Sequence, residues 1–241
     1  MLDSCPPSRP VTLPEGVSLR RVAEVLPDAW EVGAHQWADT PLQLREGPTP
    51  KPSIPVARDV MDLFRLLAER RAPYLLVGGL AMLTYVNGRN TKDVDLLMSM
   101  MTLRQIPELV LEDQNNYLAR AKFRSVHVYI LLTPNPLLKI VAEKFATKHR
   151  FDEMEIPAAS VEGLIVLKLY ALPSLCRQKD LDRAAIYETD ITMLIANHSP
   201  NLEPRAALAS RQVELGDKKE LEKIILECSE RAKLLRNRAG K

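Results

Sequence analysis

Apolar residues change their spacing along the chain, and each spacing predicts a different element. From Ala57 they fall at helical intervals, which predicts a helix that ends near Arg71. The segment YLLV that follows is short, apolar and closed by glycines, so it predicts a buried strand. Beyond it, LAMLTYV predicts a helix stopped by Asn87 and Gly88, and DVDLLM alternates as a second strand.

The second half of the chain predicts two more strands and then helices alone. Residues 102–111 are expected to form a helix that Pro107 interrupts or starts. YLARAKF and VHVYILL, separated by Arg124 and Ser125, predict a hairpin. Beyond Pro157 three helical patterns follow, at 160–172, 181–196 and 217–235. The expected fold class is α+β, a small mixed sheet core flanked by helices with a C-terminal helical domain.

The first 56 residues have a different composition. Ten of the 18 prolines lie in residues 1–55, a density that excludes long helices and central strands. One short amphipathic candidate spans 17–26. We interpret the segment as a proline-rich arm, with disorder in part of it as the alternative. The predicted division is therefore an arm (1–56), a core (57–156) and a helical domain (157–241).

Composition narrows the environment. The 241 residues carry a net charge of +2, so no strong general attraction to nucleic acid or acidic membranes is expected. Cys5, Cys176 and Cys228 are odd in number, far apart and without metal-ligand spacing, which indicates a reducing compartment and no structural zinc. No run approaches the length of a membrane span. We expect a cytoplasmic, soluble protein with no membrane contact.

The most informative stretch is VGGLAMLTYVNGRNTKDVDLL, residues 77–97. Glycines at a strand-to-helix junction let the backbone approach a ligand, and the first N–H groups of the helix favour an anion, so Gly78 and Gly79 predict a phosphate site. Asp93 and Asp95, two apart on a strand, share one face about 6.6–6.8 Å apart, near enough to share divalent cations. Glycines that admit a polyphosphate and carboxylates that bind Mg²⁺ would together form one binding site.

These residues resemble a known superfamily. The diglycine followed by Asp93-Val94-Asp95-Leu96 is similar to the signature of nucleotidyltransferases related to DNA polymerase beta, and the fuller string resembles the AbiEii-type and MenT-type toxin nucleotidyltransferases. Two downstream segments strengthen the resemblance: SVEGLIVLKLYAL, which contains Lys168, and RQKD at 177–180. Together the matches cover roughly residues 57–196.

The resemblance implies a function and a set of roles. The expected enzyme is a Mg²⁺-dependent nucleotidyltransferase that moves a nucleoside monophosphate from an NTP to an acceptor. The favoured acceptor is a tRNA 3′ end, with a protein hydroxyl as the alternative, and a toxin role implies an antitoxin protein as partner. Asp93 and Asp95 would hold metal and Lys168 would offset phosphate charge in catalysis. The nucleotide would contact Gly78, Gly79, Arg89, Thr91 and Lys168.

One position departs from the family pattern. These enzymes usually carry a third carboxylate on a later strand, but the expected position in VHVYILL holds Tyr129, and no Asp or Glu lies between Asp113 and Glu143. A phenol is a poor base and a poor magnesium ligand at neutral pH. His127 shares a face with Tyr129 and is a candidate base, although a packed histidine is the commoner case. The alternative function is therefore a catalytically impaired nucleotide-binding sensor or interaction module.

Several charged residues keep two interpretations. Lys168 lies in an apolar helix and needs a partner, which is either nucleotide phosphate or a structural pair with Asp180 or Asp190. Arg89 and Thr91 either touch phosphate or are exposed loop residues. The RQKD charges are typical of a helix junction, with Asp180 placed to cap the next helix.

The C-terminal tail is locally basic. Beyond Glu230 it carries five basic residues and no acids: Arg231, Lys233, Arg236, Arg238 and Lys241. Such a run either contacts an RNA backbone or forms a solvated helix end, where the helix dipole favours cations.

Overall fold

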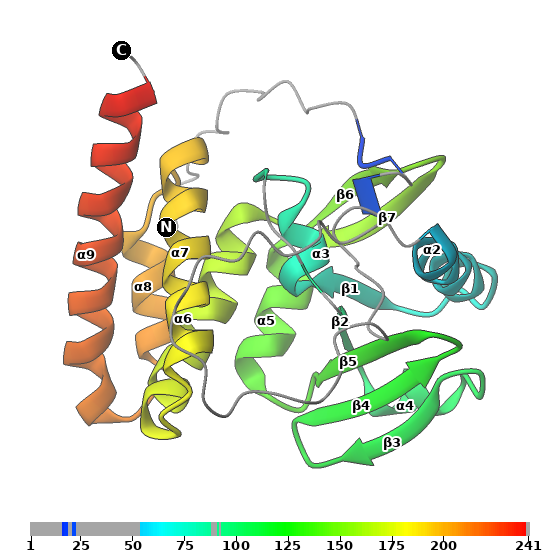
Figure 1. Ribbon diagram of the computed structural model, residues 1–241. Coiled ribbons are helices and arrows are strands. Elements are labelled where there is room, and N and C mark those ends of the chain that lie inside the picture. Colours follow the sequence, from blue (N-terminus) through cyan, green and yellow to red (C-terminus); the bar gives the residue numbers. More distant parts are fainter. Residues whose placement is uncertain (1–15, 19–20, 23–53, 88–90, 92, 240–241) are drawn as a thin grey trace, which may run out of the picture.

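The most apolar strands of the chain lie at the centre of a seven-stranded mixed sheet. The computed structural model describes residues 16–18, 21–22, 54–87, 91 and 93–239. The strand order is β3-β4-β5-β2-β1-β7-β6, and Figure 1 shows the sheet beside a stack of C-terminal helices. The strands are β1 (Tyr74–Val77), β2 (Val94–Met98), β3 (Val110–Gln114), β4 (Leu118–Phe123), β5 (Val126–Leu132), β6 (Ala146–Phe151) and β7 (Met154–Ala159).

Strands β1 and β2 lie at the centre of the sheet, with β5, β4 and β3 on the side of β2 and β7 and β6 on the side of β1. Strands β1 and β2 pair antiparallel, with Val77 opposite Asp95. Strand β5 joins β2 in parallel, with Tyr129 beside Asp95, and β7 joins β1 in parallel. The outer pairs β3–β4, β4–β5 and β6–β7 are antiparallel. A mixed sheet flanked by helices confirms the expected α+β class.

Helices flank the sheet and form the C-terminal region. Helices α2, α6, α7 and α9 lie where helical periodicity predicted them, whereas α5 and α8 were not predicted. The helices are α2 (Ile54–Glu69), α3 (Gly78–Met82), α4 (Met100–Arg104), α5 (Pro136–Lys144), α6 (Val161–Arg177), α7 (Leu181–His198), α8 (Glu203–Ser210) and α9 (Leu215–Ala239). None of the helices in these described ranges is long and apolar enough to cross a membrane.

The helix predicted over 102–111 is wrong. Helix α4 ends at Arg104, and residues 110–114 form the edge strand β3 instead. All five residues of β3 are exposed, so the strand buries no alternating face that a sequence pattern reveals. It forms because its backbone pairs with β4, at the end of the sheet.

A second hairpin, β6–β7, was also absent from the prediction. The sequence predicts only helices beyond Pro157, yet Pro157 lies inside β7 opposite Lys148. Strand β7 continues to Ala159, where Ser160 caps α6 by accepting a hydrogen bond from the Gly163 N–H. The sheet therefore crosses the predicted boundary between 156 and 157, and the division into domains stays a prediction.

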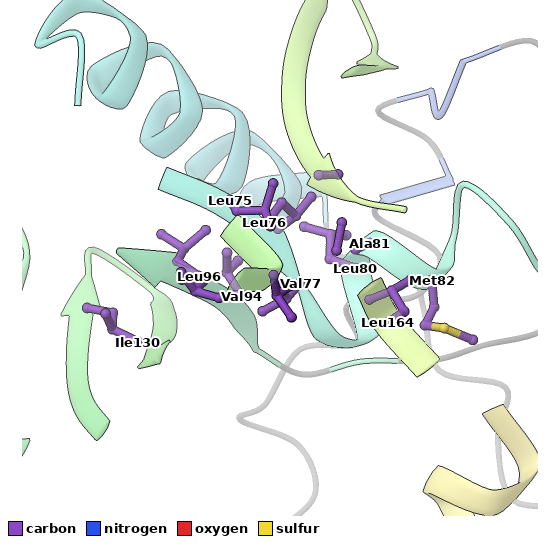
Figure 2. Packing of buried hydrophobic residues seen from close by; sticks show 14 of the residues in the cluster. Leu75, Leu76, Val77, Leu80, Ala81, Met82, Val94, Leu96, Ile130 and Leu164 are labelled. Carbon is purple, nitrogen blue, oxygen red and sulfur yellow. The ribbon is translucent and has the colours of Figure 1, made fainter. Parts of the chain in front are cut away.

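The core beside the site forms where β1 and β2 pack against α3. Leu76, Leu80 and Leu96 have no measurable exposure, and Figure 2 shows the side chains of β1, α3 and β2 gathered in one cluster, with Leu164 of α6 at its edge. Across the sheet, α2 packs against β5, and the Phe64 ring stacks on Tyr74 of β1 at 6.3 Å. This packing holds the end of β1 rigidly beside β2.

Part of the N-terminal segment docks on the sheet. Val17 pairs with Phe151 at the end of β6, with its N–H donating to the Arg150 carbonyl at 2.9 Å. Val17 and Val22 are buried, and the Arg21 guanidinium donates to the Val86 carbonyl and to the Asn87 side chain. Most of the predicted arm lies outside the described residues, so only this contact of it is established.

An aromatic cluster ties α3, β6 and α7 together. The Tyr85 hydroxyl donates to the Ala159 carbonyl at 3.0 Å and lies 2.7 Å from His149 Nε2. Since the hydroxyl hydrogen is used, the imidazole must donate through Nε2–H. His198 Nε2 lies 2.9 Å from the Tyr85 carbonyl, and its ring meets Tyr85 edge-on. Burial lowers the pKa of His149, which keeps the neutral ring in place.

This cluster predicts an acid-sensitive contribution to stability. Because the pKa of His149 is lower in the folded protein than its ordinary value of 6.5, the unfolded chain binds the proton first, and stability falls as pH drops below 6.5. One proton contributes at most about 1.4 kcal/mol per pH unit. Urea titrations between pH 7.5 and 5 should show a smaller fall for His149→Gln than for the wild type. Parallel curves for the two proteins would contradict the assignment.

Candidate nucleotide and metal site

The bend after β1 is built against an aspartate of β2. Gly78 has a φ of 64°, and a Cβ at this position would lie 1.8 Å from Asp95 Oδ2. The Gly79 N–H donates to the same oxygen at 3.4 Å, and a Cβ on Gly79 would lie 2.6 Å from the Thr91 Cβ. Both positions therefore require glycine, and the diglycine lies beside Asp95 as the sequence predicted.

The helix after the bend is shorter than expected. The sequence predicted residues 80–86, but α3 spans only Gly78–Met82 and continues as turns to Tyr85. A single helical turn supplies little dipole, and the Gly79 N–H already donates to Asp95. The phosphate-binding role of Gly78 and Gly79 therefore has less support from helix electrostatics than the sequence implied, and it stays a proposal.

Two carboxylates lie close to one another at the start of β2. Asp95 lies within the strand and Asp93 directly before it, with buried Val94 pointing the opposite way. The pKa of Asp95 is raised to about 6, first because burial removes water from its carboxylate and second because Asp93 is a neighbouring negative charge. The positive charges of Lys168 and Arg183 and the Gly79 N–H act in the opposite direction.

The structure describes one of the two predicted loop residues, Thr91, but not Arg89. The Thr91 hydroxyl donates to the Asp93 carbonyl at 3.1 Å, and its side chain fills the space beside Gly79. Thr91 therefore shapes the segment that leads into the carboxylates, and its contact with nucleotide stays a prediction. Arg89 lies outside the described residues.

Lys168 is buried and paired. Its Nζ lies 2.7 Å from Asp190 of α7 and 4.3 Å from the centre of the Tyr187 ring. Of the two structural partners weighed from the sequence, Asp190 is the one found. Asp180 instead caps α7 by accepting from the Arg183 N–H at 3.3 Å. Lys168 also attracts Asp95, so its charge is felt at the carboxylate pair.

Helix α7 contributes residues that the sequence analysis missed. Arg183 lies with its guanidinium 5.8 Å from the Tyr187 ring centre, and its charge lowers the pKa of Asp95. Arg183, Tyr187 and Asp190 are spaced by four and three residues, which places them on one helix face. That spacing in DRAAIYETD was the available signal. It became informative only once the structure showed that the charge of Arg183 acts on Asp95.

The RQKD element forms the junction between α6 and α7. Arg177 forms an ion pair with Asp217 of α9, Lys179 has a φ of 59°, and Asp180 caps α7. These contacts confirm the helix-junction interpretation. In the tail, Arg231 pairs with Glu188 and Glu227, and Arg236 donates to the Ile195 carbonyl, so part of the basic run is used to hold α9 on α7.

Strand β5 completes the face. Tyr129 is the register partner of Asp95, which confirms that a phenol stands directly beside the carboxylate pair. His127 lies on the same face, and its Nδ1 is 4.0 Å from Glu112 Oε2 on β3. Because the sequence predicted no strand over 110–114, the sequence analysis did not place Glu112 near the site.

The donor set fits a hard divalent cation in part. Two aspartates that share a face offer the oxygen ligands that Mg²⁺ prefers, and Mg²⁺ commonly takes its remaining ligands from water and substrate phosphates. The pKa of Asp95 is raised first by burial and second by the charge of Asp93, and a bound cation would stabilise the ionised carboxylate against both. Within the described residues there is no group of three or more His, Cys, Asp or Glu side chains arranged to hold a metal alone.

Comparisons with known proteins give no family. No protein-family model matches the chain, and no curated protein matches it. Among solved structures, a complex of ANT(2'')-Ia with adenylyl-2''-tobramycin aligns over 63% of this chain and 93% of that one, at 14% identity and a TM-score of 0.48.

Two further solved structures show a similar degree of likeness. The solution structure of the antibiotic-resistance factor ANT(2'')-Ia aligns over 64% of this chain and 89% of its own, at 14% identity and a TM-score of 0.49. An antigenic nucleotidyltransferase-like protein from Paracoccidioides brasiliensis aligns over 68% and 89%, at 15% identity and a TM-score of 0.43. Because all three TM-scores lie below 0.5, the function is argued from this chain's own residues.

The bend predicts that Gly78 tolerates no side chain. Gly78→Ala must adopt a left-handed conformation and displace the Asp95 carboxylate, so we expect the free energy of unfolding to fall by about 2 kcal/mol or more. The control is Gly216→Ala in α9, where a Cβ meets nothing within 4 Å and the change should stay within about 0.5 kcal/mol. Urea denaturation measures the free energy of unfolding of both variants. Equal losses would contradict the predicted clash between a side chain at position 78 and Asp95.

The raised pKa of Asp95 predicts a stability cost in the metal-free protein. Between the ordinary value of 3.8 and about 6 the folded state binds the extra proton, so stability falls as pH rises through that window. In EDTA at pH 7.5, Asp95→Asn should therefore be more stable than the wild type, by about 1–3 kcal/mol. The gain should shrink toward pH 4.

A matched control is Asp113→Asn on the exposed strand β3, which should change stability by less than about 0.5 kcal/mol at either pH. An Asp95→Asn protein that is less stable than the wild type at pH 7.5 would show that the carboxylate is held more favourably than its surroundings indicate.

Proposed function

We propose that this chain is a metal-dependent nucleotidyltransferase that transfers a nucleoside monophosphate from an NTP to a hydroxyl acceptor and releases pyrophosphate. The observation that carries the proposal is the Asp93–Asp95 pair placed against a bend that only glycine can form. Such a pair suits phosphoryl chemistry, in which catalysis consists mainly of positioning and charge neutralisation.

Each residue has a role set by its position. Asp93 and Asp95 would hold Mg²⁺, which supplies charge neutralisation to the triphosphate when bound. Gly78 and Gly79 leave room for the phosphates to approach the backbone. Arg183 is exposed on α7 and electrostatically coupled to Asp95, so its guanidinium is placed to contact phosphate oxygens.

Lys168 influences the site through its charge, from a buried position. It is buried between Asp190 and the Tyr187 ring, so we assign it to balancing the charge of Asp95 rather than to direct contact with exposed phosphate. Loss of this positive charge would remove the ion pair with buried Asp190 and would raise the pKa of Asp95 further.

The acceptor and the biological role come from the sequence resemblance. The likeness of residues 77–97 to AbiEii-type and MenT-type enzymes supports a tRNA 3′ end as acceptor, a toxin activity and an antitoxin partner. Those parts of the proposal rest on the motif alone. Exposed basic residues of α9, such as Lys233, are available for an RNA backbone.

A second function is favoured by one observation. Tyr129 stands beside Asp95 where a third carboxylate would complete the metal site. A protein that binds Mg-NTP without transferring it would be a nucleotide sensor or interaction module. The two functions share the nucleotide site and differ only in chemistry.

Transfer of label tests the proposal. Purified protein is incubated with each α-labelled NTP, magnesium and total tRNA, and label is sought in RNA and in protein. We expect label that EDTA abolishes and that Asp93→Ala reduces by about 10²-fold or more, since the metal contributes several kcal/mol to such reactions. The control Glu222→Ala removes an exposed carboxylate of α9 and should retain wild-type activity.

Two results would turn the conclusion elsewhere. Nucleotide binding by calorimetry with no transfer to any acceptor favours the sensor. No thermal shift with any Mg-NTP would remove the nucleotide site itself from consideration.

A further inference from the structure

The proposed reaction requires a group that takes the proton of the attacking hydroxyl, and β5 carries no carboxylate for this purpose. We propose that the imidazole of His127 is that proton acceptor and that Glu112 orients it. The inference rests on the proposed function and assigns the residue that removes the proton in the same site.

The sheet register places His127 beside the carboxylate pair. Strands β2 and β5 run parallel, with Val94 beside Val128 and Asp95 beside Tyr129. Asp93 and His127 directly precede the paired residues Val94 and Val128. In β5 alternate residues face opposite sides: Val126, Val128 and Ile130 are buried, whereas His127 and Tyr129 are half-exposed. His127 thus stands on the carboxylate face, one strand away, at about 4.8 Å between neighbouring strands.

Glu112 reaches His127 because β3 is irregular at that residue. The β3–β4 register shifts between Leu111 and Asp113, so Glu112 is the extra residue of a bulge. Its Oε2 lies 3.4 Å from Arg120 Nε on β4 and 4.0 Å from His127 Nδ1 on β5. One carboxylate therefore spans three strands toward the imidazole.

This arrangement selects the imidazole nitrogen that is available. A carboxylate at Nδ1 favours the proton on that nitrogen and leaves Nε2 as the acceptor. The 4.0 Å separation exceeds a direct hydrogen bond, but contacts within catalytic groups are often longer before substrate binds. The side chain is 42% exposed, so the imidazole is accessible to an acceptor and to water.

Charges of both signs face the imidazole. The negative groups are Glu112 on β3 and the aspartate pair on β2, and the positive groups are Arg120 and Lys122 on β4, with Lys122 the register partner of His127. Tyr129 is its neutral neighbour on β5. The surroundings are therefore mixed in charge rather than dominated by either sign.

The chemical step balances with this residue as base. The hydroxyl oxygen forms a bond to the α-phosphorus of the NTP as the bond from that phosphorus to the pyrophosphate oxygen breaks, and pyrophosphate leaves with the electron pair. The hydroxyl proton passes to His127 Nε2, which becomes imidazolium and later releases the proton to solvent. No further reactant is required.

Removal and rescue of the imidazole test the assignment. His127→Ala should lower the transfer rate by about 10²-fold or more while Mg-NTP affinity stays within about twofold, because a general base acts on the chemical step. Added imidazole should restore at least about tenfold of the lost rate. The control Lys148→Ala removes an exposed ammonium from β6, at the other edge of the sheet, and should keep the wild-type rate without any response to imidazole.

Glu112 is tested as a positioning residue. Glu112→Gln should lower the rate less than His127→Ala does, and Glu112→Asp should recover part of the loss. With four histidines in the chain, imidazole nitrogen NMR resolves His127, which is expected to carry its proton on Nδ1 in the wild type and to lose this preference in Glu112→Gln.

The outcomes separate the two proposals. A wild type that binds Mg-NTP but transfers nothing overturns the proposed function and this step with it. An active wild type with an equally active His127→Ala overturns only the base. Loss of rate without rescue by imidazole, or a proton found on Nε2, also overturns the assignment while leaving nucleotidyl transfer in place.

Discussion

The site depends on the contact between a glycine backbone and one carboxylate. Val77 and Asp95 are register partners, so the turn that ends β1 must pass directly over the Asp95 side chain. Gly78 and Gly79 are the residues that allow this approach. The carboxylate is therefore held by a backbone that packed strands keep in place, and its raised pKa is the electrostatic cost of that position. A preorganised ligand that is destabilised when empty favours the cation that relieves it.

The C-terminal helices supply the opposing charge. Lys168 and Asp190 are both almost fully buried, and such a pair contributes little net stability because desolvation offsets the attraction. The pair instead fixes the position of the Lys168 ammonium, whose positive charge lowers the pKa of Asp95. Arg183 adds a second positive charge from α7. The carboxylates of the sheet and the cations of the helices thus form one electrostatic unit, so the helical region is part of the site.

Much of this fold follows from the sequence, and the failures have physical causes. β1, β2, the β4–β5 hairpin and the long helices bury regular apolar faces, so their periodicity is visible. Strand β3 has no buried face, so it lacks the alternation of apolar and polar residues that marks a strand. Strand β7 contains Pro157, a residue that is unusual in a strand lying between two others, so its sequence does not indicate a strand either. Gly78, Gly79, Asp93 and Asp95 were found because they are close in sequence. Arg183 and Glu112 were missed because only long-range packing brings them to the site.

In the proposed enzyme, Tyr129 beside Asp95 separates two tasks that a third carboxylate there would share, metal binding and proton removal. A carboxylate beside Asp95 would add a third negative charge to a pair that already repels, whereas a phenol adds none. In the proposed enzyme, Asp93 and Asp95 alone would bind the metal. Proton removal would fall to His127, two residues back on the same strand face, where the β3 bulge supplies the carboxylate proposed to orient it. A base that accepts this proton gains a positive charge, and in the proposed enzyme the Glu112 carboxylate, 4.0 Å from His127 Nδ1, would balance that charge while the aspartates balance the metal ion.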